Sequence, residues 1–342
     1  MTDHTSPRMA ALHAWLGPQL ARDGITDYTL TPASVDASFR RYFRISDSAD
    51  TARTRIVMDA PPQFEDCRPF VKVAALMREG GLNAPRIHAQ NLDDGFLLLD
   101  DLGTQTYLDV LNDTTFDPLF RAANEALVKW QLASRPGELP TYEEQQILGE
   151  LALFPDWYIS KHLGVTLTDR QQTVLQSAFA LIARCNLSEP RVFVHSDYMP
   201  RNLMVCEPGP GIIDFQDAVY GPISYDIASL YRDAFISWEE ERVLDGTIRY
   251  WESARRAGLP VNPQFGDFYR DVEWMGLQRH LRILGIFARI HHRDGKPRYL
   301  EDTPRFVGYV RKTCQRYGAL KPLLGLLDEL KIGDAPVVGY TF

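Results

Sequence analysis

The sequence predicts an α+β fold with two lobes, a small strand-rich N-terminal lobe and a larger helical C-terminal lobe. Short strand-like runs joined by turns fill most of the first hundred residues, with one stretch of helical spacing among them. From residue 106 onward helical patterns dominate, apart from one polar interruption near residue 195. We therefore expect two domains, residues 1–102 and residues 103–342.

The elements of the N-terminal lobe are predicted from the spacing of its apolar residues. The polar turn SDSADTAR joins two runs into a hairpin, and the pair Gly80-Gly81 ends a helix. The expected elements, in chain order, are a helix over residues 8–22, strands over 39–45 and 55–58, a helix over 68–80, and strands over 85–88 and 96–99.

Composition limits the function classes that the chain can serve. With 37 basic and 45 acidic residues the net charge is −8, so no broad basic field is available for a nucleic-acid backbone. The four cysteines have neither metal-ligand nor redox spacing, which is typical of reduced thiols in the cytoplasm. No apolar run is long enough to be a signal peptide or to span a membrane. We expect a cytoplasmic protein without a nucleic-acid, membrane or obligatory protein partner.

The polar interruption in the helical lobe reads VFVHSDYMPRNLMV, residues 192–205. Polar loops next to buried strands are frequent sites of chemistry. A turn, CEPGPG, and a second short apolar run, GIIDF, follow it. We expect Asp197, Asn202 and Asp214 to converge at the ends of one hairpin.

These three side chains suit phosphoryl transfer. Asp197 can orient and deprotonate an attacking hydroxyl, while Asn202 and Asp214 supply the hard oxygen ligands that Mg²⁺ prefers. The spacing Asp-x4-Asn, followed by a hydrophobic residue, Asp and Phe, is typical of a kinase catalytic loop, in which His195 also has a counterpart. The alternative is that these residues cap turns. The strand-rich lobe upstream favours a protein-kinase-like fold.

The chain resembles the aminoglycoside phosphotransferase-like kinases, and within them the bacterial kinases that phosphorylate N-acetylmuramate and N-acetylglucosamine at the anomeric C1 hydroxyl during cell-wall recycling. The resemblance covers nearly the whole chain. It is carried by HSDYMPRNLM together with DASFRRYFRI (36–45), FLLLDDLG (96–103), LFPDWYISKHLG (153–164), IDFQDAVYGPISYDIASLYRDAFISWEE (213–240) and EWMGLQRHLRILGIFARI (273–290).

This resemblance implies ATP and Mg²⁺ as cofactors and a small amino sugar as substrate. Aminoglycoside, choline and homoserine acceptors remain alternatives within the superfamily, and a kinase-shaped binding module without turnover is the alternative outside catalysis. Asp197 would be the catalytic base, with Asn202 and Asp214 as the metal ligands. The implied ATP-binding residues are Ser38, Phe39 and Arg40 of a phosphate-covering loop and Leu99, Asp100, Asp101 and Leu102 of the connector that meets adenine.

One feature of the resembling kinases is missing from this chain. Their strand corresponding to residues 55–58 ends in a lysine that contacts the nucleotide phosphates, whereas this chain has Met58-Asp59 and two prolines. Arg44 is the expected substitute, because alternation along its strand places it on one face with Tyr42. The alternative for Arg44 is an arginine at a solvent-facing edge.

Further residues are candidates for the acceptor site or its support. Asp226, Ser229 and Asp233 have the spacing of one helix face. Asp226 is either a first-turn carboxylate favoured by the helix dipole or, by resemblance, a support of the catalytic loop together with His195. Asp233 and Arg279 are candidates for binding sugar hydroxyls or a carboxylate, with structural ion pairing as the alternative.

Overall fold

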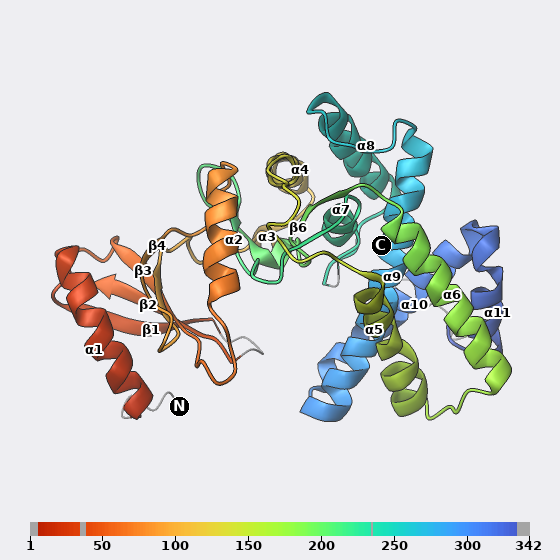
Figure 1. Cartoon of the computed structure of the whole chain (residues 1–342), viewed down its shortest axis with the longest axis horizontal. Helices are drawn as coiled ribbons and strands as arrows, with labels where there is room; N and C mark the ends of the chain where they lie inside the picture. Colours follow the sequence, from red (N-terminus) through yellow and green to blue (C-terminus); the bar gives the residue numbers. More distant parts are fainter. Residues whose placement is uncertain (1–5, 35–38, 234, 334–342) are drawn as a thin grey trace. The chain divides into compact units, whose positions relative to one another are not determined.

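The computed structural model describes residues 6–34, 39–233 and 235–333 (Figure 1). The chain forms two compact units. The first consists of Met1–Ala133 with Arg201–Asp217, and the second of Ser134–Pro200 with Ala218–Phe342. The first unit contains the whole predicted N-terminal lobe; the lobe boundary between residues 102 and 103 stays a prediction.

A five-stranded antiparallel sheet is the centre of the first unit, with the order β1-β2-β3-β5-β4. The predicted hairpin and the strand over 96–99 are confirmed, and the strand expected over 85–88 lies at Ile87–Asn91. An additional edge strand, β1, precedes them and pairs with β2. The strands are β1 (Tyr28–Ser34), β2 (Arg41–Asp47), β3 (Thr54–Asp59), β4 (Ile87–Asn91) and β5 (Phe96–Leu99).

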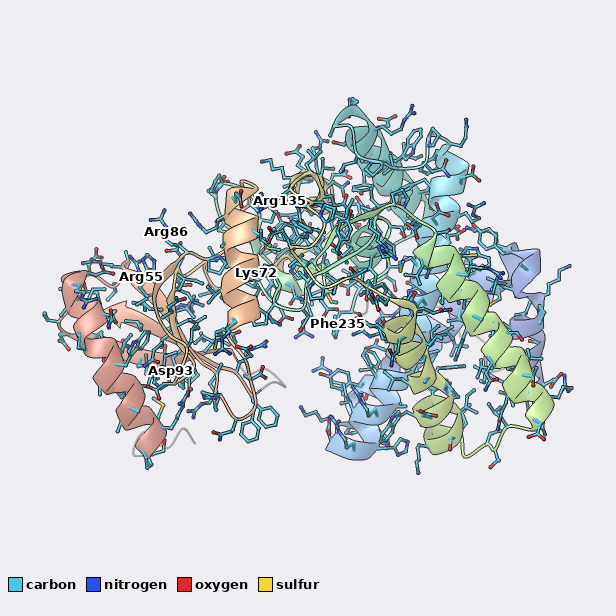
Figure 2. All side chains as sticks on the ribbon, in the orientation of Figure 1. Arg55, Lys72, Arg86, Asp93, Arg135 and Phe235 are labelled. Atoms are coloured by element: carbon cyan, nitrogen blue, oxygen red, sulfur yellow. The ribbon has the colours of Figure 1, made fainter. Side chains whose placement is uncertain are left out.

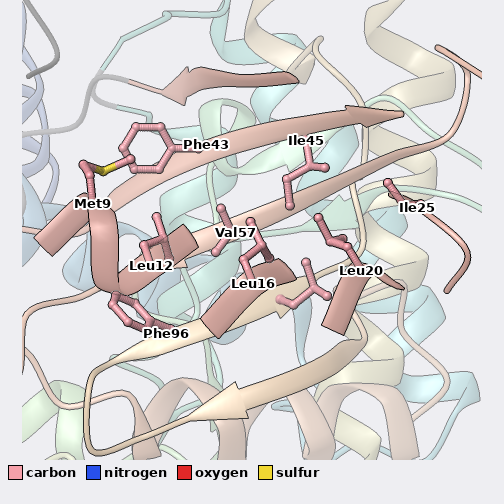
Figure 3. Close-up of a cluster of buried hydrophobic side chains, with 10 residues drawn as sticks. Met9, Leu12, Leu16, Leu20, Ile25, Phe43, Ile45, Val57 and Phe96 are labelled. Carbon is pink, nitrogen blue, oxygen red and sulfur yellow. The ribbon is translucent and has the colours of Figure 1, made fainter. Parts of the chain in front are cut away.

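Helix α1 (Pro7–Arg22) buries its apolar stripe against one face of this sheet. Strand β2 contributes Phe43 and Ile45 to this core, because successive side chains of a strand point to opposite faces. Tyr42 and Arg44 therefore lie on the other face. Figure 3 labels nine members of the core: Met9, Leu12, Leu16, Leu20, Ile25, Phe43, Ile45, Val57 and Phe96.

The first unit also holds a short hairpin, β7 (Leu203–Met204) with β8 (Gly211–Ile212). It is joined to the chain that follows helix α2 (Arg68–Glu79), because Ile212 N–H donates to the Asn83 carbonyl at 2.8 Å. The side-chain amide of Asn83 donates to the Gly209 carbonyl at 3.4 Å. Two further helices complete the described part of this unit, α3 (Tyr107–Val110) and α4 (Phe116–Leu132).

The second unit is mainly helical and is organised by α9 (Phe265–Asp294), which packs against most of its neighbours. Gly285 lets α9 pack closely against the backbone of Leu153, because a Cβ atom at position 285 would lie 2.4 Å from the carbonyl carbon of Leu153. The other described elements are α5 (Glu144–Leu153), the π-helix η1 (Phe154–His162), α6 (Asp169–Leu187), β6 (Arg191–Val194), β9 (Val219–Pro222), α7 (Tyr225–Tyr231), α8 (Glu240–Arg256), the 3-10 helix η3 (Pro297–Asp302), α10 (Thr303–Arg316), the 3-10 helix η4 (Gly318–Leu320) and α11 (Lys321–Glu329).

Strand pairing differs from the single hairpin that we expected around the polar motif. Strand β6 pairs with β9, whereas β7 pairs with β8. Asn202 and Asp214 thus flank one hairpin of the first unit, while Asp197 follows β6 in the second unit. Within the described ranges, no helix is both long and apolar enough to cross a lipid bilayer.

Candidate active site

A cavity of about 360 Å³ lies in the first unit, on the sheet face opposite α1. Its wall combines side chains of the sheet, the connector and the β7–β8 hairpin. The principal lining residues are Tyr42, Arg44, Ile56, Phe70, Leu99, Asp100, Asp101, Leu102, Gly103, Thr106, Arg201, Asn202, Met204, Asp214 and Phe215. Six predicted functional residues of the connector and hairpin, together with Arg44, are thereby gathered around one space.

The β7–β8 hairpin places Asn202 beside Asp214. Ile213 N–H donates to the Asn202 carbonyl at 3.1 Å, and the Asn202 side-chain amide donates to Oδ2 of Asp214 at 3.4 Å. Asp214 has a φ of 61°, in the left-handed region that non-glycine residues rarely adopt. Such strain is concentrated at functional sites, where surrounding contacts maintain it. The two side chains offer oxygen atoms suited to a small divalent cation.

Gln216 holds the Asp214 carboxylate from the other side, a contact that the sequence motif did not predict. Its Nε2 donates to Oδ1 of Asp214 at 3.0 Å and to Oδ2 of Asp217 at 3.2 Å. Its Oε1 is buried without a hydrogen-bond donor, so an oxygen ligand remains available beside Asp214. A useful signal was the run Asp-Phe-Gln-Asp, in which an amide lies between two carboxylates.

Arg44 lines the cavity as its strand alternation predicted, but its guanidinium is bound to the connector. Nε and Nη2 donate to the two carboxylate oxygens of Asp101 at 2.6 and 3.0 Å, and Nη2 also donates to the Gly103 carbonyl at 2.7 Å. The alternative of a solvent-facing edge arginine is wrong, because its side chain is 21% exposed. Hydrogen bonding to Asp101 raises the pKa of Arg44.

Asp101 stays ionised in this pair. Burial acts to raise its pKa, but hydrogen bonds from Arg44, the Gly103 N–H and Thr54 outweigh burial, and the pKa is lowered. The neighbouring Asp100 accepts from Arg86 N–H at 3.1 Å and interacts with His88 Nε2 at 2.7 Å. Both carboxylates therefore fix the connector.

The predicted phosphate-covering loop is described in part. Ser38 lies outside the described residues. Phe39 stacks on Phe64 with ring centroids 4.3 Å apart, and Arg40 forms an ion pair with Glu65 at 2.8 Å. Neither Phe39 nor Arg40 is among the described residues that line the cavity. Their contact with phosphates stays a prediction.

In the second unit, the loop after β6 is fixed by Asp226 at the start of α7. Its carboxylate accepts from the N–H of His195 at 2.7 Å and from the N–H of Ser196 at 3.1 Å. Ser196 has a φ of 80°, and Asp197 N–H donates to Nδ1 of His195 at 3.3 Å. The two predicted supports therefore both contact the backbone of this loop: Asp226 from helix α7, and His195 from within the loop.

Asp226 is completely buried, and its ionisation is affected accordingly. Burial raises the pKa of Asp226 to about 6, opposed by the imidazole and N–H of His195 and by Arg279. A carboxylate with this pKa is mostly ionised at neutral pH and can accept both backbone hydrogen bonds.

Arg279 also contacts the loop after β6. Its Nη1 donates to the Ser196 carbonyl at 2.9 Å, and its guanidinium lies over the Tyr225 ring, 4.9 Å from the centroid. The side chain is buried. Its observed contacts are thus those of a positioning residue for the loop, and sugar binding by Arg279 stays a prediction.

Asp233 does not continue the helix face of Asp226 and Ser229, so that prediction is wrong. Helix α7 ends at Tyr231, because the backbone leaves the helical region at Arg232. Oδ1 of Asp233 accepts from the backbone N–H of Phe235 at 3.3 Å; Phe235 is labelled among the side chains in Figure 2. A sugar contact of Asp233 stays a prediction.

Glu189 is a buried support that the sequence did not reveal. It accepts from the N–H and the hydroxyl of Ser224 at 3.1 and 2.8 Å, directly before α7. Burial raises its pKa to about 8, with a smaller contribution from Asp271. Glu189 thereby fixes the end of α7 that carries Asp226.

The oxygen atoms of Asn202 and Asp214 suit a cation that is also coordinated by a bound phosphate ligand. Across the described ranges, no group of three or more His, Cys, Asp or Glu side chains is arranged to hold a metal ion. Mg²⁺ typically needs only one or two protein carboxylates when phosphate oxygens supply further ligands. Asn202 and Asp214 fit that requirement.

The fold and the site together define a kinase-like α+β protein. The phosphotransferase enzyme family model matches residues 29–261, and the chain belongs to this family. Among solved structures, the ethanolamine kinase of Plasmodium vivax has a similar fold, with a TM-score of 0.62, 11% identity, and coverage of 89% of this chain and 87% of that one. An aminoglycoside phosphotransferase in a ternary complex with streptomycin and ATP has a TM-score of 0.56, 13% identity, and coverage of 86% and 96%.

Curated relatives are much closer in sequence. The N-acetylmuramate/N-acetylglucosamine kinase of Pseudomonas aeruginosa is 54% identical over 304 residues, covering 89% of each chain. The kinase of the same name from Pseudomonas putida is 47% identical over 333 residues, covering 95% of this chain and 97% of that one.

Proposed function

We propose that this protein is a kinase that transfers the γ-phosphoryl group of ATP to the anomeric C1 hydroxyl of N-acetylmuramate and N-acetylglucosamine. Mg²⁺ would be the metal. The reaction would take place in the cytoplasm, as a step of cell-wall recycling. The observation that carries the proposal is the 54% identity, over 89% of both chains, with a kinase named for these two sugars. Asn202 and Asp214 in the cavity, and Asp197 in the loop held by Asp226, would supply groups for the chemistry.

The first unit would bind the nucleotide. The connector backbone over residues 99–102 would meet adenine, and Asn202 and Asp214 would hold the metal together with phosphate oxygens. When bound, Mg²⁺ would neutralise charge on the phosphates. The amide of Gln216 would keep the Asp214 carboxylate oriented towards the metal.

Asp197 would be the catalytic base. Asp197 would accept a hydrogen bond from the C1 hydroxyl and take its proton as the sugar oxygen bonds to the γ-phosphorus. The bond between that phosphorus and the bridging oxygen would break, with ADP as the leaving group. Asp226 and Arg279 would maintain the conformation of the loop that carries Asp197.

Two alternatives follow from the same fold. Ethanolamine kinase shares it, so a different small hydroxyl acceptor is the second candidate within the family. A binding module without turnover is the candidate outside catalysis, motivated by the missing strand lysine.

Phosphorus NMR tests these candidates in one experiment. Purified protein with Mg-ATP is incubated separately with N-acetylmuramate, N-acetylglucosamine, glucose, choline and kanamycin. We expect an anomeric sugar phosphate in the first two tubes, and its loss in the Asp197→Asn variant with nucleotide binding retained. Product only with choline or kanamycin would overturn the substrate. Absence of product in every tube despite ATP binding would contradict catalysis on these acceptors.

A further inference from the structure

We propose that Arg282 of α9 determines how the protein discriminates between its two sugars, by binding the lactyl carboxylate that N-acetylmuramate has and N-acetylglucosamine lacks. This inference rests on the proposed function, since it assumes that both sugars place their C1 hydroxyl at Asp197. It gives to Arg282, which the sequence analysis left without a role, the carboxylate contact for which Arg279 was a candidate. The two sugars are otherwise alike, so a residue that recognises the carboxylate should act on one substrate alone.

Arg282 lies beside the loop that carries Asp197. Arg279, three residues earlier on α9, donates to the Ser196 carbonyl of this loop at 2.9 Å and lies over the Tyr225 ring. Arg282 contacts the other end of that tyrosine, since its Nη1 donates to the Tyr225 hydroxyl at 3.0 Å. Burial acts to lower the pKa of Arg282, but nearby acidic groups, among them Tyr225 and Asp197, outweigh burial and raise it. The guanidinium therefore lies within the electrostatic influence of the proposed base.

The two arginines differ in what their guanidinium groups can still bind. The Arg279 side chain is buried and its Nη1 is bonded to the loop, whereas the Arg282 side chain is 27% exposed. The ion pair of Arg282 with Oε2 of Glu150 is 3.7 Å long, too long for a direct hydrogen bond, and that oxygen already accepts from the Tyr142 hydroxyl at 2.7 Å. In the described part of the chain, Nε and Nη2 of Arg282 donate to no other residue. One edge of the guanidinium thus remains for a ligand.

A second arginine on the same side of α9 adds positive charge. Arg289 follows Arg282 by seven residues, about two helical turns, which places both on one face. Among the described residues Arg289 has no hydrogen-bond or ion-pair partner, and its Nε is buried. Burial lowers the pKa of Arg289, as do the charges of Arg293 and Arg282, against the opposing effect of Asp294. In a chain of net charge −8, such an arginine pair favours an anionic ligand at this face.

A carboxylate is the anion that the Nε–Nη2 edge of Arg282 suits. The two nitrogens can donate parallel hydrogen bonds to one carboxylate, as the same two nitrogens of Arg44 do to Asp101. N-Acetylglucosamine has a neutral hydroxyl where N-acetylmuramate has the lactyl ether, so it leaves this edge to water, while Nη1 stays bonded to Tyr225. We therefore expect Arg282 to favour N-acetylmuramate without excluding N-acetylglucosamine.

Steady-state kinetics with three sugars test the inference: N-acetylmuramate, its carboxamide, which is neutral and of similar size, and N-acetylglucosamine. We expect Arg282→Gln to lower kcat/KM for N-acetylmuramate about 10- to 50-fold, while kcat/KM for N-acetylglucosamine stays within about threefold of the original protein. In the original protein the carboxamide should lose a similar factor relative to N-acetylmuramate. The variant should no longer distinguish the two.

Two further variants complete the test. Arg282→Lys should recover part of the loss for N-acetylmuramate, because it restores the positive charge without the two-pronged geometry. Arg293→Gln is the matched control, since Arg293 is a 58%-exposed arginine of the same helix whose guanidinium is bound to Asp294. It should leave kcat/KM for all three sugars within about twofold of the original protein.

The outcomes separate the inference from the proposed function. Equal losses for both natural sugars in Arg282→Gln would overturn the inference, because they would indicate a structural role at Tyr225 and Glu150. An original protein that phosphorylates the carboxamide as well as N-acetylmuramate would overturn it without any substitution, and would leave the proposed function standing. An original protein that phosphorylates neither natural sugar would overturn both.

Discussion

Replacing Asp226 by Asn should separate catalysis from stability. Asn keeps one acceptor oxygen for the two backbone N–H groups of His195 and Ser196, and directs an NH₂ group at the other. A hydrogen bond to a charged acceptor is worth about 1.5–3 kcal/mol. In the variant the loop loses this interaction energy in the conformation that places Asp197. The activation free energy rises by the same amount, and kcat falls about 10- to 150-fold.

The fold itself should tolerate the change. A rise of the Asp226 pKa from 3.8 to about 6 corresponds to about 3 kcal/mol against the ionised form at neutral pH. Asn removes that cost, and the unfavourable contact of its NH₂ group with a backbone N–H acts in the opposite direction. We expect the free energy of unfolding at pH 7 to change by less than about 1.5 kcal/mol, and Tm by a few degrees.

The pH dependence gives a second readout. The folded state binds the Asp226 proton more tightly than the unfolded chain, so its contribution to stability is greatest below about pH 4 and declines as pH rises to about 6. Below about pH 6 the protonated carboxyl holds the loop less well, so kcat of the original protein should fall. The Asn variant should lack this acidic limb.

Steady-state kinetics of sugar phosphorylation and thermal unfolding, each from pH 5 to 9, measure these effects. Asp245→Asn is the matched control, since Asp245 is a 56%-exposed carboxylate on α8 in the same unit. A folded Asp226→Asn variant with kcat within about twofold of the original would show that the charged acceptor of Asp226 is not needed to position Asp197. Retention of the acidic limb in that variant would show that the limb does not come from Asp226.

Two further predictions concern buried or metal-binding carboxylates. The folded-state pKa of Glu189 is raised from 4.5 to about 8, so its contribution to stability is lost as pH rises between these values. Glu189→Gln should remove this decline of Tm with pH and should have a higher Tm than the original protein at pH 9. An unchanged decline of Tm with pH in the variant would contradict the raised pKa of Glu189. Asp214→Ala should abolish the gain in ATP affinity that Mg²⁺ provides, measured by titration with and without the metal; an undiminished gain would exclude Asp214 from the metal site.

The elements of the first lobe were largely predictable because each is encoded locally. The helical spacing over 68–80 and the alternation over 39–45 are properties of neighbouring residues, and α2 and β2 follow them closely. Strand β1 was not among the predicted elements. It is an edge strand that contains Pro32 and has a register irregularity between Pro32 and Ser34, so its alternation is interrupted.

The pairing of the short strands could not be read from the sequence. Two-residue strands such as β7 and β8 carry almost no periodic signal, and β6 finds its partner in β9 well beyond the motif. We predicted a single hairpin because the apolar runs on either side of the motif are close together in the sequence. In the structure these runs pair in two separate hairpins, so Asp197 belongs to the second unit, and Asn202 and Asp214 belong to the first.

The spacing from Asp197 to Asn202 and the position of Asp214 before a phenylalanine are fixed by covalent order, so the sequence alone was enough to predict a phosphotransferase, the family to which the chain belongs. The groups that support these residues could be identified only in the folded chain. Asp226 accepts a hydrogen bond from His195, 31 positions away in the sequence, and Asp101 binds Arg44 across 57 positions. Such contacts depend on burial and on the directions of side chains, which folding alone brings together, so the roles of Arg44, Gln216 and Arg279 could not be inferred from spacing.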